Sequence, residues 1–205
     1  MKREQQPLLL GGFEVYQSWL DVEAQAGLLD AARAIATAAP LFSPVTRFGK
    51  PMSVRMTSAG QWGWVADQGG YRYAPRHPGG SDWPPIPTPL LDIWQVLTGL
   101  TRLPDSCLIN FYDQSARMGL HQDRDEASFD WPVLSISLGD DALFRIGGVE
   151  RRAPTQSVWL RSGDIVLMGG AARLCHHGVD RIRHGSSRLL PDGGRVNLTL
   201  RVVEK

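Results

Sequence analysis

The chain has 205 residues, of which 42% are hydrophobic and 21% are charged, a composition typical of one soluble globular domain. Its 22 basic and 21 acidic residues give a net charge of +1, which excludes a uniformly basic nucleic-acid-binding protein, so any such contact needs a local basic face. No apolar run approaches the roughly 20 residues that cross a bilayer. We therefore expect a cytoplasmic protein with no membrane partner, and we expect it to act as a monomer.

The first predicted element is a helix in the stretch "LDVEAQAGLLDAARAIATAAP". Asp21 has a side chain suited to an N-cap, and Pro40 ends the segment because it cannot continue a helix. The spacing of apolar residues predicts that one face of this helix contains Val22, Ala26, Leu29 and Ala36.

Residues 40–87 are rich in glycine and proline and contain short alternating runs such as "MSVRMTS", which predict hairpins and loops. A second helix is predicted in "TPLLDIWQVLTG". We expect Thr88 to be its N-cap, Pro89 its first helical residue and Gly99 its end.

From residue 105 onward the pattern changes to short strands separated by glycine and aspartate turns. These runs are "CLINFY", "VLSISLG", "ALFRIGG", "SVWLRSGDIVLMGG" and "RVNLTLRVV". Repeated short strands of this kind predict a sandwich or jelly roll. We expect one β-dominated α+β domain over residues 1–205, in which helices and loops fill about 1–100 and the β-rich core about 101–205.

Two cysteines, Cys107 and Cys175, are too few to form a disulfide framework in a chain of this length. In a reducing compartment we expect both to remain thiols. The same count excludes a structural zinc site built on Cys-x-x-Cys pairs.

The stretch "LHQDRDEASF" contains a candidate metal site. His121 and Asp123 are two positions apart, so in extended backbone both side chains project to the same side. "LCHHGV" offers a further ligand in His176 or His177. Two histidines and one carboxylate, with other coordination positions open, form the facial triad of non-haem Fe(II) oxygenases. A solvated polar turn and a zinc site remain alternatives for the same residues.

The last predicted strand, "RVNLTLRVV", alternates strictly between apolar and polar residues. Its apolar face contains Val196, Leu198, Leu200 and Val202, and its polar face contains Arg195, Asn197, Thr199 and Arg201. The strand is either an edge strand with a wet outer face or an inner strand whose arginines face a cavity. Two buried guanidinium groups require anionic partners, and a dicarboxylate that chelates iron at one end meets that requirement.

An ordered set of motifs resembles the AlkB-type DNA dealkylation dioxygenases. The set is "LINFY", "LHQDRDE", "SISLG", "FRIGG", "SGDIVLMGG", "HHGV" and "RVNLTLR", and "MSVRMTSAGQWGWVADQGGYRY" is similar to the nucleotide-recognition lid of that family. The resemblance covers roughly residues 45–203. It implies a double-stranded β-helix, or jelly roll, with N-terminal helices and a substrate-recognition lid. It also implies Fe(II), 2-oxoglutarate and molecular oxygen as cofactor and co-substrates.

The resemblance implies roles for single residues. His121, Asp123 and His177 would be the iron ligands, with His177 preferred over His176 because the family has a glycine directly after its distal histidine. Arg201 would hold the far carboxylate of 2-oxoglutarate, while Arg195 would act at its near end and at the catalytic centre. The rest of the co-substrate pocket would be Leu108, Asn110, Tyr112, Met118, Ser135 and Asn197.

For the substrate, the resemblance implies that Trp64 stacks on the damaged base opposite His121 and that Asp125 faces the edge of the base. Tyr71 and Arg151 would hold the nucleic-acid strand, and Met56 would also line the substrate site. Trp62 in "QWGW" is a second candidate for stacking.

The implied reaction is oxidative demethylation of alkylated bases such as 1-methyladenine and 3-methylcytosine. The substrate would be single- or double-stranded DNA, with RNA left open. Two other hypotheses remain at this point: an oxygenase of the same kind that acts on a protein, lipid or small molecule, and a non-catalytic jelly roll that binds nucleic acid or metal.

Overall fold

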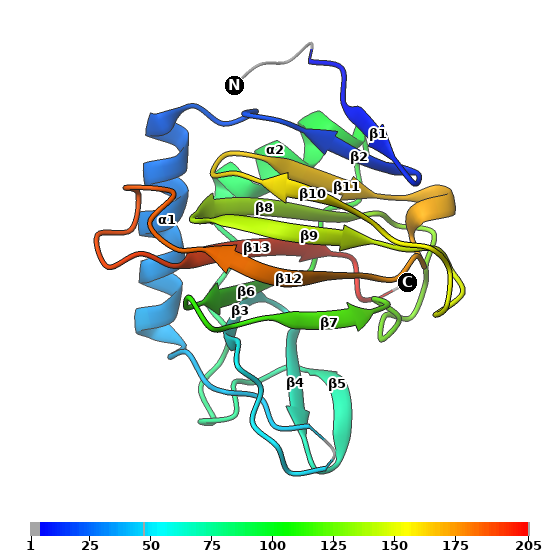
Figure 1. The fold of residues 1–205 in the computed structure, drawn as a ribbon. Coiled ribbons are helices and arrows are strands. Elements are labelled where there is room, and N and C mark those ends of the chain that lie inside the picture. Colours follow the sequence, from blue (N-terminus) through cyan, green and yellow to red (C-terminus); the bar gives the residue numbers. More distant parts are fainter. Residues whose placement is uncertain (1–4, 47, 205) are drawn as a thin grey trace.

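A computed structural model describes residues 5–46 and 48–204 of the chain, and two facing antiparallel sheets form a jelly roll in it (Figure 1). The larger sheet has the strand order β1 (Leu8–Leu10), β2 (Phe13–Tyr16), β11 (Ile165–Met168), β8 (Val133–Gly139), β13 (Arg195–Arg201), β6 (Ser106–Tyr112) and β3 (Arg55–Gly60). The smaller sheet has the order β10 (Gln156–Leu160), β9 (Asp141–Ile146), β12 (His177–Arg183) and β7 (Met118–His121). The remaining elements are the hairpin of β4 (Gly63–Asp67) and β5 (Gly70–Ala74) and the helices α1 (Val22–Ala38) and α2 (Thr88–Thr98). The predicted β-dominated jelly roll is confirmed.

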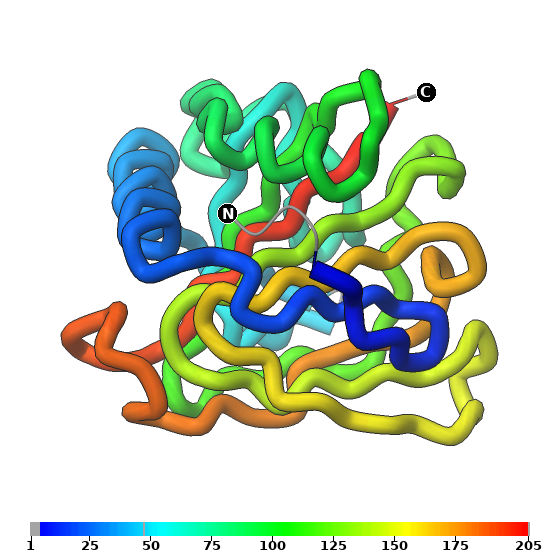
Figure 2. Tube along the Cα trace, turned by 90° about the horizontal axis from the view of Figure 1, so that it is seen from above, coloured from blue at the N-terminus to red at the C-terminus, as the bar shows by residue number. Residues whose placement is uncertain are grey.

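The larger sheet is the middle layer of the molecule, between the two helices and the smaller sheet (Figure 2). One apolar core fills the space between the helices and the larger sheet, with Leu28, Trp94 and Leu198 among its buried members. A second core, which includes Phe13 and Phe144, fills the space between the two sheets. Side chains on the inner faces of both sheets can therefore reach the same interior space.

Strand β13 is central, which decides between the two readings of its sequence. It pairs with β6 on one side and β8 on the other, so the edge-strand alternative is wrong. The apolar residues of the strand join the core beneath the helices. Its polar residues, although also buried, face the opposite way, toward the smaller sheet.

Helix α1 begins and ends as predicted but turns a different face inward. The Asp21 carboxylate accepts a hydrogen bond from the Ala24 amide at 2.9 Å and caps the helix, which ends two residues before Pro40. The residues buried along this helix are Leu28, Leu29, Ala32 and Ile35. Of the predicted face only Leu29 is buried: Val22 is 78% exposed and Ala26 is also exposed, so most of the prediction was wrong. In an alanine-rich helix several faces satisfy apolar spacing, and the larger Leu and Ile side chains determine which one packs.

Helix α2 is displaced by one residue from its predicted start. The N-cap is Pro87, whose carbonyl accepts from the Leu90 amide at 2.9 Å, so Thr88 is the first helical residue and Pro89 the second. Proline is tolerated there because amides of the first turn have no partner within the helix. Gly99 ends the helix in the left-handed conformation, with φ of 67°, as expected.

The hairpin of β1 and β2 was not predicted, although its turn has a recognisable signal. Gly11 and Gly12 separate two apolar runs and both have positive φ, the requirement of a tight two-residue hairpin turn. Strand β2 then pairs with β11. Together with β3, this hairpin carries part of the first hundred residues into the larger sheet, so the boundary expected near residue 100 does not separate the strands.

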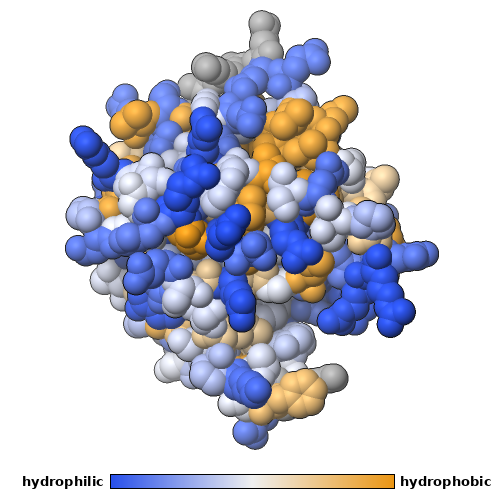
Figure 3. Space-filling model, in the orientation of Figure 1, coloured by the Kyte–Doolittle hydropathy of each residue, from blue (hydrophilic) through white to orange (hydrophobic). Residues whose placement is uncertain are grey.

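The β4–β5 hairpin extends beyond the lower end of the two facing sheets in Figure 1. It pairs with itself and belongs to neither of the other sheets. On the face of the smaller sheet that points outward, hydrophilic side chains predominate (Figure 3). Arg181 and Arg183 of β12 are exposed. The inner faces and the hairpin are therefore the places where an enclosed site can form.

Both cysteines are free thiols in the interior. Burial raises the pKa of Cys107 to about 12, so its thiol stays protonated at neutral pH. In the described part of the chain, no helix is long and apolar enough to span a bilayer.

Candidate active site

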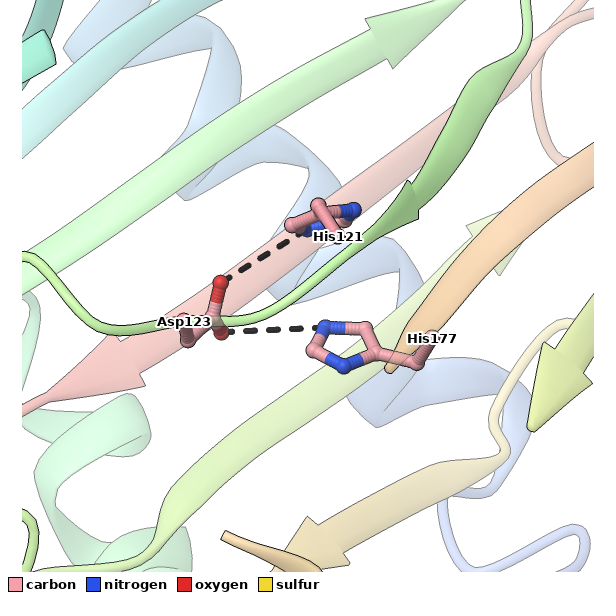
Figure 4. Close-up of side chains that lie close together, drawn as sticks. All are labelled: His121, Asp123 and His177. Atoms are coloured by element: carbon pink, nitrogen blue, oxygen red, sulfur yellow. Dashed lines mark ion pairs between the residues drawn. The ribbon is translucent and has the colours of Figure 1, made fainter. Parts of the chain in front are cut away.

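Three potential metal ligands meet at one end of the smaller sheet, and their side chains point toward one another (Figure 4). His121 ends β7, and its register partner on the neighbouring strand is His177, the first residue of β12. The Asp123 carboxylate lies 3.6 Å from Nε2 of His121 and 3.8 Å from Nε2 of His177. All three ligand atoms lie within 4.8 Å of one another, a spacing that a single metal ion can bridge.

Hydrogen bonds on the far side of each imidazole determine which nitrogen faces the carboxylate. Nδ1 of His121 donates to the Gly119 carbonyl at 2.9 Å, and Nδ1 of His177 donates to the Cys175 carbonyl at 3.1 Å. Because Nδ1 carries the proton in each ring, each Nε2 presents a lone pair to the space beside Asp123. The two rings are therefore oriented as metal ligands.

The charge state of the triad also suits a divalent cation. Burial by itself raises the pKa of Asp123, but the charges of Arg201, His177 and His121 outweigh it and hold that pKa well below its usual range. Burial lowers the pKa of His177 to about 4, against the opposing effect of Asp123. At neutral pH the site therefore offers an ionised carboxylate and a neutral His177 imidazole. A solvated turn does not describe Asp123, because its side chain is only 9% exposed.

A cavity of about 910 Å³ extends from the triad into the space between the sheets. It is lined by all the residues assigned to the co-substrate from the sequence: Leu108, Asn110, Tyr112, Met118, Ser135, Arg195, Asn197 and Arg201. Nε and Nη1 of Arg195 and Nη1 of Arg201 are buried and find no hydrogen-bond partner among the described residues. Because unpaired buried donors are costly, these atoms fit a bound anion.

Arg201, and not Arg195, is in direct contact with a member of the metal triad. Arg201 was assigned to the end remote from the metal, but its Nη2 donates to the Asp123 carboxylate at 2.7 Å. Arg195 was assigned to the catalytic centre, yet its Nη2 donates to Ser137 at 2.9 Å and its guanidinium lies 5.1 Å from the centre of the Tyr112 ring. The sequence pattern predicts that both side chains share a face but does not reveal which end of the strand lies beside the metal.

The residues assigned to substrate from the sequence all line the same cavity: Met56, Trp64, Tyr71, Asp125 and Arg151. The rings of Trp64 and Tyr71, one from each strand of the hairpin, lie 5.5 Å apart and are inclined by 30°. Nε1 of Trp64 donates to the Asp125 carboxylate at 2.8 Å. An aromatic pair thus borders the cavity on the side of the hairpin.

The geometry separates the residues that the sequence left in doubt. Trp64 lines the cavity, whereas Trp62 is absent from its described lining. His176 reaches the cavity, but its Nδ1 donates to the Gly148 carbonyl at 3.1 Å, and it is not one of the three residues whose ligand atoms converge. His177 therefore completes the group.

Three side chains at the site were not selected from the sequence: Tyr73, Glu126 and Arg173. Glu126 stands in the charged run "DRDE", where no spacing rule distinguishes a buried carboxylate from solvated ones. Arg173 follows a 3-10 turn, Gly170–Ala172, whose sequence gives no indication that an arginine turns inward. The alternation of β5 gives the only signal for Tyr73, because Tyr71 and Tyr73 are two residues apart.

A facial group of two histidines and one carboxylate inside a jelly roll, beside buried arginines, defines a non-haem iron oxygenase. The family model described as the 2OG-Fe(II) oxygenase superfamily matches residues 12–201, and the chain belongs to that superfamily and, more narrowly, to the AlkB family. It is an Fe(II)/2-oxoglutarate-dependent dioxygenase whose co-substrates are 2-oxoglutarate and molecular oxygen.

Three comparisons give the extent of this likeness. The chain is 57% identical over 191 residues to the alpha-ketoglutarate-dependent dioxygenase AlkB homolog of Caulobacter vibrioides, covering 93% of this chain and 87% of the relative. The DNA N(6)-methyladenine demethylase ALKBH1D of Arabidopsis thaliana is 42% identical over 108 residues, 48% of this chain and 24% of that protein. A solved structure of OsALKBH1 superposes with a TM-score of 0.82 and 29% identity, covering 97% of this chain and all of that chain.

Gly178 provides a test of the triad that leaves all three ligands unchanged. A Cβ at Gly178 meets the Met118 carbonyl oxygen at 2.6 Å and the Gly119 carbonyl oxygen at 2.8 Å, so β7 must move away from β12. We expect Gly178→Ala to weaken Mn(II) binding by about tenfold or more, since it separates His121 from His177. Titration of the metal-free protein, followed by electron paramagnetic resonance, measures this.

The matched control is Gly119→Ala, on the neighbouring strand, where an added Cβ meets nothing within 4 Å. We expect its Mn(II) affinity to stay within about twofold of the wild type. Equal affinities in the two variants would contradict the view that close approach of β7 and β12 holds the histidines together.

Proposed function

We propose that this enzyme removes methyl groups from ring nitrogens of alkylated nucleic-acid bases, such as 1-methyladenine and 3-methylcytosine in DNA. The observation that carries the proposal is a single cavity with a metal triad and buried arginines inside and an aromatic pair, Trp64 and Tyr71, at its mouth. DNA is the favoured polymer because the AlkB-type motifs point to it. The free thiols of Cys107 and Cys175 support a cytoplasmic location.

The iron ligands in this proposal are His121, Asp123 and His177. Their convergence within 4.8 Å supports the assignment, as do the Nδ1 hydrogen bonds that leave both Nε2 atoms free. His121 is the most accessible of the three, with 39% of its side chain exposed, so it lies on the side from which substrate arrives. Three protein ligands leave coordination positions for 2-oxoglutarate and oxygen.

For 2-oxoglutarate, Arg195 holds the far carboxylate and Arg201 acts beside the metal. The contact of Arg201 with Asp123 supports the second role, and the unpaired Nε and Nη1 of Arg195 support the first. Asn110, Tyr112 and Asn197 complete the polar wall, while Leu108, Met118 and Ser135 shape the remaining space. The planar guanidinium of Arg195 can meet a carboxylate with two parallel hydrogen bonds.

For the base, Trp64 supplies a stacking surface facing His121, and Asp125 accepts a hydrogen bond from an exocyclic amine. Stacking on an aromatic side chain contributes roughly 1–3 kcal/mol per base. Extrusion of a base from a duplex costs a few kcal/mol, and less when methylation already prevents pairing, which favours damaged bases. Met56 lines the floor of the cavity, and Tyr71 and Arg151 hold the strand outside it.

The overall reaction replaces one methyl C–H bond by C–OH. One oxygen atom of O₂ enters the methyl group, and the other enters succinate as 2-oxoglutarate loses its metal-side carboxylate as carbon dioxide. The N–CH₂OH product then breaks its N–C bond: the electron pair returns to the ring nitrogen, formaldehyde leaves and the hydroxyl proton passes to solvent. Bound Fe(II), 2-oxoglutarate and oxygen supply the oxidising chemistry. The residues of the chain orient both substrates, keep the carboxylates paired with arginine and exclude water from the buried end of the cavity.

The direct test incubates the enzyme anaerobically with Fe(II), 2-oxoglutarate and a 3-methylcytosine oligonucleotide and then admits oxygen. We expect equal amounts of formaldehyde and repaired cytosine, and no product from Asp123→Ala, because that variant lacks the carboxylate ligand. Methylated peptide, fatty acid and small amine acceptors are run in parallel. Turnover of one of these, with the oligonucleotide unchanged, would show that the oxygenase serves another substrate class.

The order of the arginines is tested with 2-oxopentanoate, which has a methyl group where 2-oxoglutarate has its far carboxylate. With Mn(II) in place of Fe(II), the wild type should prefer 2-oxoglutarate by about 10- to 100-fold, as expected for loss of a charge-assisted pair. Arg195→Met should bind both ligands equally, while Arg201→Lys should keep the preference. Calorimetry measures all the affinities, and loss of the preference in Arg201→Lys alone would restore the order predicted from the sequence.

Trp64→Ala tests the stacking surface. We expect binding of the methylated oligonucleotide to weaken by about 5- to 150-fold, which corresponds to roughly 1–3 kcal/mol, while 2-oxoglutarate consumption without substrate continues. Trp159→Ala is the control, since that indole packs against Arg183 outside the cavity lining. Fluorescence anisotropy and succinate assays measure the two properties, and their equal loss in Trp64→Ala would assign that indole to the fold.

A further inference from the structure

Glu126 is a buried carboxylate that none of the roles above uses. Its side chain is 1% exposed, and it is the shared partner of two buried arginines and the partly buried Tyr73. Nη2 of Arg173 lies 3.1 Å from Oε2, Nε of Arg201 lies 3.3 Å from Oε1, and the Tyr73 hydroxyl donates to Oε1 at 2.7 Å. Each of these partners comes from a different segment of the chain.

Arg173 fixes the position of the segment that contains Glu126. Its Nη1 donates to the Asp123 backbone carbonyl at 2.6 Å and its Nε to the Trp131 carbonyl at 2.9 Å, in addition to the contact with Glu126. Arg173 precedes His177 by four residues. Its hydrogen bond to Asp123 therefore connects the segment that leads to His177 with the backbone of a second potential ligand. Its charge is buried and requires Glu126 as a counter-ion.

Charge balance links Glu126 to Arg201. Asp123, Glu126, Arg173 and Arg201 form a buried group of two carboxylates and two guanidiniums, whose charges cancel. Nη2 of Arg201 is used by Asp123 and Nε by both carboxylates, and Nη1 is the remaining donor, buried without a partner in a residue that lines the cavity. Glu126 thus helps to determine which donor of Arg201 a ligand can meet.

One cross-strand pair of the hairpin β4–β5 contacts the segment that contains Asp125 and Glu126. Trp64 and Tyr73 are register partners, and they donate to the consecutive residues Asp125 and Glu126. Burial, together with the nearby carboxylates, raises the pKa of Tyr73, so its hydroxyl is a neutral donor. Tyr73 of the hairpin and Arg201 beside the triad therefore share one acceptor, Oε1 of Glu126.

We propose that Glu126 is a positioning residue that links Arg201 to the substrate-recognition hairpin. It orients the guanidinium for the metal-side carboxylate of 2-oxoglutarate and, through Tyr73, keeps the hairpin over the cavity. The inference rests on the proposed role of Arg201. A buried ion cluster that only stabilises the fold predicts instead that loss of Glu126 weakens every part of the domain equally.

Three variants separate these accounts: Glu126→Gln, Tyr73→Phe and, as a matched control, Arg72→Gln. Arg72 pairs with Asp67 within the hairpin, where both side chains are about half exposed, and this pair makes no contact with Glu126. Two properties are measured in the full chain with Mn(II): the Kd of 2-oxoglutarate by calorimetry, and amide hydrogen exchange in β4–β5 and in β13 by mass spectrometry.

We expect Glu126→Gln to raise the Kd of 2-oxoglutarate by about tenfold or more and to accelerate exchange in β4–β5 by a similar factor. Exchange in β13 should change less than about threefold. Tyr73→Phe should accelerate exchange in β4–β5 while the Kd stays within about threefold, because both arginines still hold Glu126. Arg72→Gln should leave the Kd and the exchange in β13 unchanged.

If Glu126→Gln accelerated amide hydrogen exchange equally in β13 and β4–β5, Glu126 would only stabilise the fold and the proposal would be overturned. Unchanged exchange in β4–β5 for Tyr73→Phe would overturn it as well, and this second variant decides the question if Glu126→Gln fails to fold. Neither measurement uses nucleic acid. Absence of formaldehyde release from methylated oligonucleotides would therefore remove the proposed substrate and leave this inference standing.

Discussion

Arg195 and Arg201 project from the inner face of β13, the central strand of the larger sheet, into an interior where water cannot solvate their charges. The rest of the site depends on this constraint, because a guanidinium there must meet an anion. Arg201 meets the carboxylate that also belongs to the metal triad, while Arg195 donates to Ser137 and lies against the Tyr112 ring. The protein therefore contains one cation paired with its metal site and another that fits the free end of a dicarboxylate.

Alternation was the most reliable guide to the fold. In β13 every second residue is apolar, and the two faces enter different spaces as the pattern requires. Alanine-rich sequence was a poorer guide, since α1 offers several apolar stripes and only the bulk of Leu28 and Ile35 selects one. The short hairpin β1–β2 escaped notice because its strands have only three and four residues, too few for periodicity to register.

The sequence predicted which residues line the cavity but not which end of β13 lies beside the metal. The motifs that resemble the AlkB family identified the side chains that line the cavity, because such motifs are local properties of the chain. Whether Arg195 or Arg201 lies beside the metal depends on how β13 runs past β7 and β12, which is a property of the tertiary structure. Glu126 was invisible for a related reason: only the folded chain brings Arg173, Arg201 and Tyr73 around it.

The β4–β5 hairpin forms a small sheet of its own, joined to the jelly roll through side chains rather than through the strand ladders. Its turn and its outward residues can therefore accumulate insertions or new aromatic groups without shifting the register of the strands that hold iron. Evolution can in this way diversify the accepted targets while the oxidative machinery stays constant. A redesigned or transplanted hairpin needs to preserve the Trp64 and Tyr73 pair, together with the hydrogen bonds of Ala66 with Val45 and of Ala74 with Trp83, to remain anchored.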